Sequence, residues 1–334
     1  MYQAVSTAPP TWRARAGFGL KLFTSILLLA LLFWLADIGA ALRAVGEPAL
    51  LPLLFAVILA PVNQFISAYK WQFLLQAQKL TMRFGAAVRM YFIGSFAGLY
   101  LPTNIGGDAL RLFLARGYGP IEIVAATIAT ERVTGIAGLL LFAMVGLALG
   151  SPAFFAGTGL AWSWLGVVLL VPAVFLAIMR PVLLGDLLIF CRLHKLGKAG
   201  AKTESKLLGM VAAMDRFRGT PWVLWQAMLW SIIFYGVLVT SQYCQLLMVG
   251  AEVTIIHVLM VAPLIPLISL VPISINGIGI AESAFVIGYV ALGVPAEIAL
   301  AAALVRRVFY SVAVLPGLAF WLQGKRSWAP PQSY

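Results

Sequence analysis

Charged side chains are scarce in this sequence, at 10% of its 334 residues, whereas a soluble domain carries roughly a quarter. Hydrophobic residues make up 62%, and the mean hydropathy is +0.99. Apolar stretches recur along the chain that approach the roughly 20 residues a helix needs to cross a bilayer. We therefore expect a single transmembrane domain over residues 20–323, between a cytoplasmic N-terminal segment (1–19) and a cytoplasmic tail (324–334).

Cysteine and histidine are also scarce, at two residues each. Cys191 and Cys244 form no CxxC motif, and His194 and His257 are isolated, so we expect neither a disulfide framework nor a metal site. The sequence motifs of metalloproteases, serine hydrolases and P-loop nucleotidases are absent as well. We therefore expect no cofactor and no enzymatic activity, and any transport should be passive or driven by a gradient.

Basic residues outnumber acidic ones by 23 to 11, which gives a formal net charge of +12. They lie mainly between apolar segments, as the positive-inside rule predicts for cytoplasmic loops, so we expect no nucleic-acid partner. The most basic stretch, 180–218, should be a cytoplasmic loop, whereas the uncharged Ser151–Gly159 should face outward. Basic residues near both chain ends place the two termini in the cytoplasm, and we expect a multi-pass protein of the bacterial inner membrane.

Six apolar segments are long enough to cross the bilayer as helices. Two further apolar regions, Ala86–Ala115 and Ile255–Leu292, are interrupted by Pro, Asn and Gly, and the loop charges require each to enter and leave on the same side. We expect these two regions to form re-entrant helical hairpins. The six expected spans are Leu20–Ile38, Leu50–Tyr69, Ile121–Gly150, Leu160–Met179, Trp222–Gly250 and Ala296–Gln323.

The order of these segments predicts an inverted repeat. Residues 20–150 read as span, span, hairpin, span, and residues 160–323 read the same way with the opposite orientation. The hairpin tips also match, with Pro102 and Gly107 corresponding to Pro272 and Gly277. Inverted repeats with broken helices are typical of secondary transporters, whose sites lie near the middle of the membrane between the repeats. The expected fold is therefore an all-α polytopic membrane protein.

The first hairpin contains a turn of Pro, Asn and Gly followed by two charged residues. The proline stops the incoming helix, the glycines free the backbone, and Asp108 can cap the next short helix, with Arg111 on nearly the same face. One interpretation is a polar cavity that receives an anionic headgroup. The other is a capping turn whose Arg111 extends to cytoplasmic phosphates. The candidate substrate-binding residues are Asn104, Gly106, Gly107, Asp108 and Arg111.

The second hairpin offers a similar set, comprising Asn276, Gly277, Gly279 and Glu282. A lone carboxylate in an apolar limb is costly, so Glu282 needs a cationic partner or must stay protonated. Arg306 and Arg307 of the following span are the available cations. Both are candidate site residues, and Arg307 is the expected partner because it corresponds to Arg132 in the first repeat.

Two more charged pairs have open interpretations. Glu131 and Arg132 lie inside the third span, where they form either a local structural ion pair or, through Arg132, part of the cavity beside Asp108. Lys70 and Trp71 close the second span, and an aromatic residue beside a base is ordinarily an anchor at the membrane interface. We expect Lys70 and Trp71 to be such an anchor, and we include Glu131 and Arg132 among the candidate site residues.

Several of these features together resemble the flippase-like family that includes the transmembrane region of lysylphosphatidylglycerol synthases. They are Lys70-Trp71, the segment Leu101–Arg111, Glu131-Arg132 and the segment Pro272–Glu282. The resemblance covers about residues 20–323 and implies lipid translocation, with the polar and glycine residues of both hairpins at the site. The synthases carry a soluble aminoacyl-transfer domain after this region. This sequence ends at Tyr334 without one, so we expect no lipid aminoacylation.

The expected function is translocation of a lipid whose polar headgroup is anionic and phosphate-bearing, or glycosylated. The expected partners are this membrane lipid and enzymes of lipid biosynthesis. An alternative is an accessory or scaffold protein that binds lipid without moving it. A third hypothesis, an intramembrane lipid transferase with Asp108 or Glu282 as base, has no visible nucleophile to support it.

Overall fold

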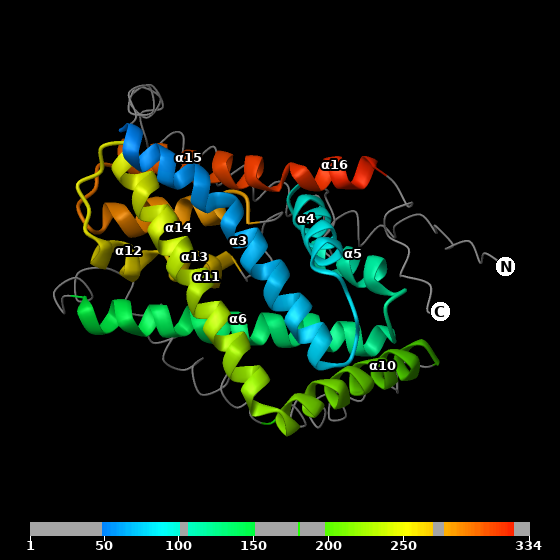
Figure 1. Cartoon of the computed structure of the whole chain (residues 1–334). Coiled ribbons are helices and arrows are strands. Elements are labelled where there is room, and N and C mark those ends of the chain that lie inside the picture. Colours follow the sequence, from blue (N-terminus) through cyan, green and yellow to red (C-terminus); the bar gives the residue numbers. More distant parts are fainter. Residues whose placement is uncertain (1–48, 101–105, 151–179, 181–197, 270–276, 324–334) are drawn as a thin grey trace.

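A computed structural model describes residues 49–100, 106–150, 180, 198–269 and 277–323. Within these ranges the regular elements are helices (Figure 1). The first part of the chain holds α3 (Leu50–Ala77), α4 (Phe84–Tyr100), α5 (Gly106–Ala115) and α6 (Ile121–Leu149). The second part holds α10 (Lys198–Asp215), a 3₁₀ turn (Arg216–Gly219), α11 (Pro221–Met248), α12 (Ile255–Val261), α13 (Leu264–Ser269), α14 (Ile280–Val290), α15 (Ala296–Val314) and α16 (Pro316–Leu322).

Four of the described helical segments are apolar and long enough to cross a membrane: α3, α6, α11 and the run Ala296–Leu322 formed by α15 and α16. Each has 27 to 29 residues. At 1.5 Å per residue they measure about 40 Å, against about 30 Å of hydrocarbon. The chain is therefore a multi-pass membrane protein, and four of the six expected spans correspond to helices long and apolar enough to cross. The other two, Leu20–Ile38 and Leu160–Met179, lie outside the described residues, as do both chain ends.

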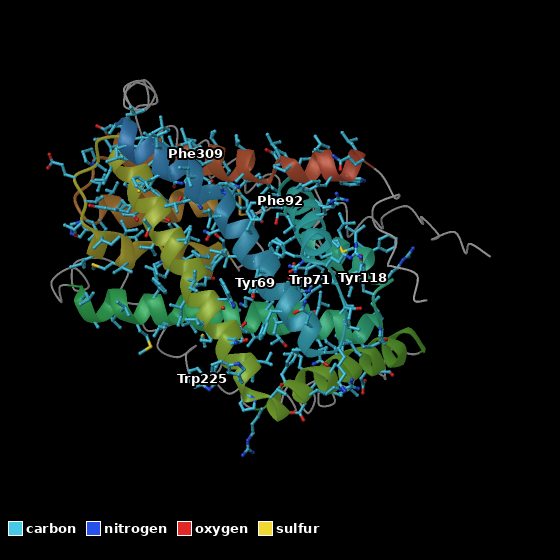
Figure 2. All side chains as sticks on the ribbon, viewed as in Figure 1. Tyr69, Trp71, Phe92, Tyr118, Trp225 and Phe309 are labelled. Carbon is cyan, nitrogen blue, oxygen red and sulfur yellow. The ribbon has the colours of Figure 1, made fainter. Side chains whose placement is uncertain are left out.

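The outward-facing side chains are those of a membrane protein. Trp225, near the start of α11, is 70% exposed and projects away from the bundle, whereas Trp71 points inward from α3 (Figure 2). Trp222 is exposed beside Trp225, next to the basic 3₁₀ turn that precedes α11. Tryptophans beside basic residues are typical of a membrane–water boundary. The start of α11 therefore marks such a boundary.

The two 28-residue helices, α3 and α11, run antiparallel. The amide of Ala49 before α3 donates to the carbonyl of Met248 at the end of α11, at 3.3 Å. Further along, the rings of Tyr69 and Trp230 lie 4.7 Å apart. In Figure 1, α6 and the α15–α16 run also cross the view in opposite directions. Corresponding long helices of the two halves thus point opposite ways.

The two interrupted regions are broken helices, as expected. The first forms α4 and α5, and the second forms α12, α13 and α14. The α4–α5 pair is held by glycines, because a Cβ at Gly106 would lie 3.2 Å from the Cα of Gly98, and one at Gly107 would overlap the carbonyl of Gly94. Close backbone contact at small residues is a common means of helix packing in membranes. The expected hairpin tips, residues 101–105 and 270–276, lie outside the described residues.

We predict that Gly107→Ala destabilises the protein by about 2 kcal/mol, because the new methyl group meets rigid backbone. The matched control is Gly135→Ala on α6, where an added Cβ meets nothing within 4 Å. That change should be neutral, or stabilising by up to about 1 kcal/mol. Thermal unfolding of the purified protein in detergent measures both. Equal midpoints for the two variants would contradict the glycine contact.

Candidate functional site

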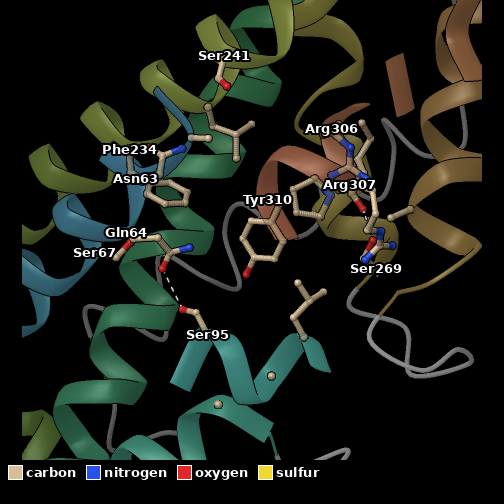
Figure 3. Close-up of a pocket in the computed structure, with 18 of the residues that line it drawn as sticks. Asn63, Gln64, Ser67, Ser95, Phe234, Ser241, Ser269, Arg306, Arg307 and Tyr310 are labelled. Carbon is tan, nitrogen blue, oxygen red and sulfur yellow. Dashed lines mark hydrogen bonds between the residues drawn. The ribbon is translucent and has the colours of Figure 1, made fainter. Parts of the chain in front are cut away.

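A cavity of about 790 Å³ lies between the two halves of the chain. Helices α3, α4, α5 and α6 contribute to its walls from the first half, and α11, α13, α14 and α15 from the second (Figure 3). Its size is that of a small-molecule binding site, for which roughly 300–1,000 Å³ is common. Its charged lining residues are Asp108, Arg111, Arg132, Arg306 and Arg307.

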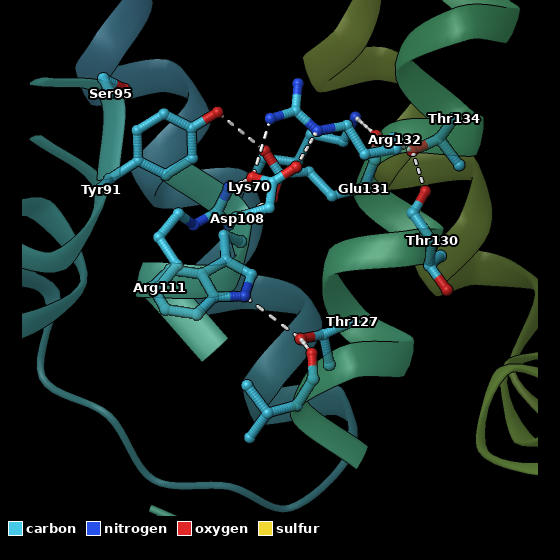
Figure 4. A network of polar contacts seen from close by, with 12 residues as sticks. Lys70, Tyr91, Ser95, Asp108, Arg111, Thr127, Thr130, Glu131, Arg132 and Thr134 are labelled. Carbon is cyan, nitrogen blue, oxygen red and sulfur yellow. Dashed lines mark hydrogen bonds and ion pairs between the residues drawn. The ribbon is translucent and has the colours of Figure 1, made fainter. Parts of the chain in front are cut away.

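A buried ion pair between Arg111 of α5 and Glu131 of α6 lies beside the cavity (Figure 4). The Nη2 of Arg111 lies 2.6 Å from Oε2 of Glu131, and its Nη1 lies 3.1 Å from Oδ1 of Asp108. The side chain of Arg111 is only 2% exposed. Its guanidinium carbon lies 4.3 Å from the ring centre of Trp71 and 4.2 Å from that of Tyr91. Arg111 is thus held by two carboxylates and two rings.

Lys70 and Trp71 belong to the same network, so their interpretation as an interface anchor is wrong. Lys70 is 5% exposed, and its Nζ donates to the carbonyl of Glu131 at 3.0 Å and to the hydroxyl of Ser231 at 2.6 Å. Trp71 is fully buried and donates from Nε1 to the hydroxyl of Thr127 at 3.2 Å. These partners accept hydrogen bonds from the Lys70 ammonium group inside the protein. The helix therefore does not end at Lys70, and α3 continues to Ala77.

A second ion pair faces the cavity. Arg132 of α6 binds Asp108 of α5 through two contacts of 2.8 Å, from Nε and Nη2. The side chain of Arg132 is 59% exposed and that of Asp108 is 37% exposed. Glu131 and Arg132 are neighbours, and neighbouring helical residues point about 100° apart. Glu131 pairs with Arg111 in the protein interior, whereas Arg132 pairs with Asp108 at the cavity.

The second half contains a similar arrangement on α14 and α15. Arg307 Nε donates to Oε1 of Glu282 at 2.7 Å, and Arg306 Nη2 lies 3.9 Å from the same oxygen. This confirms Arg307 as the closer partner. Glu282 also accepts from the backbone amide of Gly279 at 2.8 Å, which caps the first turn of α14.

The two halves therefore place charges alike. In each, a carboxylate in the first turn of a short helix meets an arginine on the following long helix, 24 or 25 residues later in the sequence. With Lys70, the described residues bring five cationic groups to this region against three carboxylates. Counted in their ionised forms, these groups leave a surplus of positive charge around the cavity. The arrangement favours an anionic ligand.

Amide side chains form another wall of the cavity, and the sequence reasoning missed them. We call this the amide wall: Asn63 and Gln64 of α3 with Gln242 and Gln245 of α11. Gln64 accepts from the hydroxyl of Ser95 at 2.9 Å, and Gln242 donates to the hydroxyl of Tyr289 at 2.9 Å. The available signal was a pair of polar residues three positions apart in each apolar span, Gln64 with Ser67 and Gln242 with Gln245, which places each pair on one helix face.

Sequence similarity to known proteins identifies the family of this chain. A family model of the lysylphosphatidylglycerol synthase transmembrane region matches residues 19–317. The chain belongs to this family. It is also 23% identical, over 321 residues, to the UPF0104 membrane protein PH1989 of Pyrococcus horikoshii. That similarity covers 91% of this chain and 93% of the relative. The resemblance inferred from the hairpins and charged pairs is confirmed.

The remaining expected site residues of this family member divide into three groups. Gly106 and Gly107 line the cavity at the start of α5. Gly277 and Gly279, with φ of +70° and +84°, lead into α14 in a conformation that favours glycine. Asn104 and Asn276 lie outside the described residues. The glycines thus lie at the N-terminal ends of the two short helices that carry Asp108 and Glu282.

We predict that Glu131→Gln lowers stability by roughly 3–5 kcal/mol, because it removes the close carboxylate partner of a buried arginine. Asp108→Asn is the comparison variant and should cost less, because Asp108 lies farther from Arg111, at 3.1 Å, and its pair with Arg132 is partly exposed. Thermal unfolding in detergent distinguishes them. A larger loss for Asp108→Asn than for Glu131→Gln would reverse the roles assigned to the inner and outer pairs.

Proposed function

We propose that this protein moves a lipid with an anionic, phosphate-bearing headgroup between the two leaflets of the cytoplasmic membrane. The observation that carries the proposal is the surplus of arginines around a cavity shared by two oppositely directed halves. Unbalanced charge inside a membrane is costly, and an anionic headgroup relieves it. Arginine suits this role because its planar guanidinium binds phosphate through two hydrogen bonds.

Arg132 and Arg307 are the proposed phosphate ligands. Both line the cavity, and both have partly exposed side chains. Asp108 and Glu282 hold these arginines in place through ion pairs. On binding, the phosphate takes over part of that hydrogen bonding. Such movement makes and breaks no covalent bond, so no residue acts as a catalytic residue.

The apolar part of the lipid has a route beside the same site. Phe234 and Leu238 of α11 line the cavity together with Ile265 of α13. The neighbouring helix α15 exposes Val308 and Val312 to the surroundings. In this arrangement the headgroup occupies the cavity while the acyl or prenyl chains stay in the bilayer. The substrate crosses without exposing its charge to hydrocarbon.

The movement is proposed to use an inverted repeat of six spans and two re-entrant hairpins, with both chain ends in the cytoplasm. The equal lengths and antiparallel course of α3 and α11 support it. The matching ion pairs on α5–α6 and α14–α15 support it as well. Transporters built in this way open to each side in turn by rocking one repeat against the other.

We predict that Arg132→Gln and Arg307→Gln each slow translocation by about tenfold or more, since a charge-assisted hydrogen bond contributes roughly 1.5–3 kcal/mol. The assay follows fluorescent phosphatidylglycerol in proteoliposomes by adding a quencher that reaches only the outer leaflet. Arg116→Gln is the control, because Arg116 lies just after α5, is exposed and does not line the cavity.

Wild-type rates in both cavity variants would reject the assigned roles. If the wild type binds the lipid but does not speed its exchange between leaflets, the protein is instead an accessory lipid binder for enzymes of lipid biosynthesis. Binding and movement are therefore measured on the same preparation.

The inverted arrangement has a separate test in the loops that follow α3 and α11. Thr81 and Glu252 occupy these loops and are exposed. In a variant with Cys191 and Cys244 replaced by serine, we predict that Thr81→Cys reacts with a membrane-impermeant thiol reagent from the cytoplasmic side and Glu252→Cys from the outer side. Intact cells and inside-out vesicles report the two sides. Labelling of both residues from one side would reject the inverted repeat.

A further inference from the structure

The amide wall contains hydrogen-bonding groups that the described protein leaves unused. Neither Oδ1 of Asn63 nor Oε1 of Gln245 has a hydrogen-bond partner among the described residues. Gln245 is only 4% exposed, and its Nε2 donates to the hydroxyl of Ser241. A buried polar atom without a partner costs roughly 1–3 kcal/mol. Two such carbonyl oxygens belonging to one cavity wall indicate that a ligand supplies the missing donors.

The α3 part of the amide wall, Asn63 and Gln64, lies opposite the arginines of α15. In Figure 3, Asn63 and Gln64 on α3 lie across from Arg306 and Arg307 on α15, with Tyr310 between them. A ligand that extends from α15 to α3 therefore meets cationic donors at one end and uncharged amides at the other. The two ends select different chemical groups.

The phosphate cannot supply the hydrogen-bond donors that the amide end needs. An ionised phosphodiester only accepts hydrogen bonds, whereas the free carbonyl oxygens of Asn63 and Gln245 need a donor. An ammonium group can donate, but it would add positive charge to a region that already has a surplus. The carboxylates that might balance it, Asp108 and Glu282, are paired with arginines. A hydroxyl group donates and accepts without adding charge, so it also fits an amide in either orientation.

We infer that the amide wall is a subsite for the uncharged hydroxyl groups of the headgroup, so that the ligand is a phosphodiester bearing a polyol or sugar. This inference rests on the proposed function and narrows its substrate class. Lipids whose headgroup ends in an ammonium group, such as an ethanolamine or an aminoacyl ester, are selected against. The lipid source is favoured over a free polyol phosphate because Phe234, Leu238 and Ile265 line the same cavity.

The test measures lipid binding to the full-length protein in nanodiscs by competition. Three probes differ only in the headgroup: phosphatidylglycerol has a phosphate and hydroxyls, phosphatidylmethanol has the same charge without hydroxyls, and phosphatidylethanolamine has an ammonium group. We expect phosphatidylglycerol to bind about fivefold more tightly than phosphatidylmethanol, as one added hydrogen bond provides. Phosphatidylethanolamine should bind most weakly.

The decisive variant is Gln245→Met, which keeps the side chain's length and removes its amide. It should bring the ratio of the phosphatidylglycerol and phosphatidylmethanol affinities close to one. Gln76→Met is the control, because Gln76 is exposed on α3 and does not line the cavity. It should preserve the wild-type ratio.

Equal binding of phosphatidylglycerol and phosphatidylmethanol by the wild type, or an unchanged ratio in Gln245→Met, would overturn the inference. Competition by the soluble headgroup glycerophosphoglycerol at the affinity of the whole lipid would overturn the lipid source. Because the assay measures binding, its result is independent of movement between leaflets. If the wild type prefers phosphatidylglycerol to phosphatidylmethanol but does not translocate lipid, only the proposed function is rejected. If it translocates lipid without this preference, only the present inference is rejected.

Discussion

The buried pair of Arg111 and Glu131 is the contact around which the first half of this protein is organised. Arg111 comes from α5 and Glu131 from α6, while Trp71 of α3 and Tyr91 of α4 cover the two sides of the guanidinium. The ion pair and the two ring contacts therefore join four helices. Lys70 extends the network by donating to the carbonyl of Glu131 and to the hydroxyl of Ser231 on α11. Burying these charges is affordable only because each has close partners.

This inner pair also determines where the cavity charges lie. Since Glu131 points toward Arg111, its neighbour Arg132 is turned about 100° away and reaches Asp108 at the cavity. Asp108 in turn stands one helical turn before Arg111 and contacts it at 3.1 Å. The exposed pair is thus positioned by the buried one. A change in the interior would therefore also displace the arginine of the proposed ligand site, although it does not touch that arginine.

The sequence was most informative where the physical signal is local. Apolar length predicted the described spans, and proline and glycine predicted the two broken regions, because both signals depend on neighbouring residues. The pairing of Glu282 with Arg307 was also predictable, since the surrounding segments offer few other cations. Lys70 was misread because its partners, Glu131 and Ser231, are 61 and 161 residues away. The amide wall was missed for the same reason: glutamines on α3 and α11 form one surface only after the helices pack.

The partners of the cavity arginines suit reversible binding. An unpaired arginine in the membrane interior would be costly, and one with permanently satisfied bonds would have nothing to offer a phosphate. Here each carboxylate has a second partner: Asp108 contacts Arg111 as well as Arg132, and Glu282 has Arg306 and the amide of Gly279 besides Arg307. When a phosphate binds Arg132 or Arg307 in the proposed cycle, the carboxylate that it displaces therefore keeps another partner. The net binding free energy is then the difference between two similar ion pairs. This difference is small, so the headgroup can dissociate again in the proposed cycle.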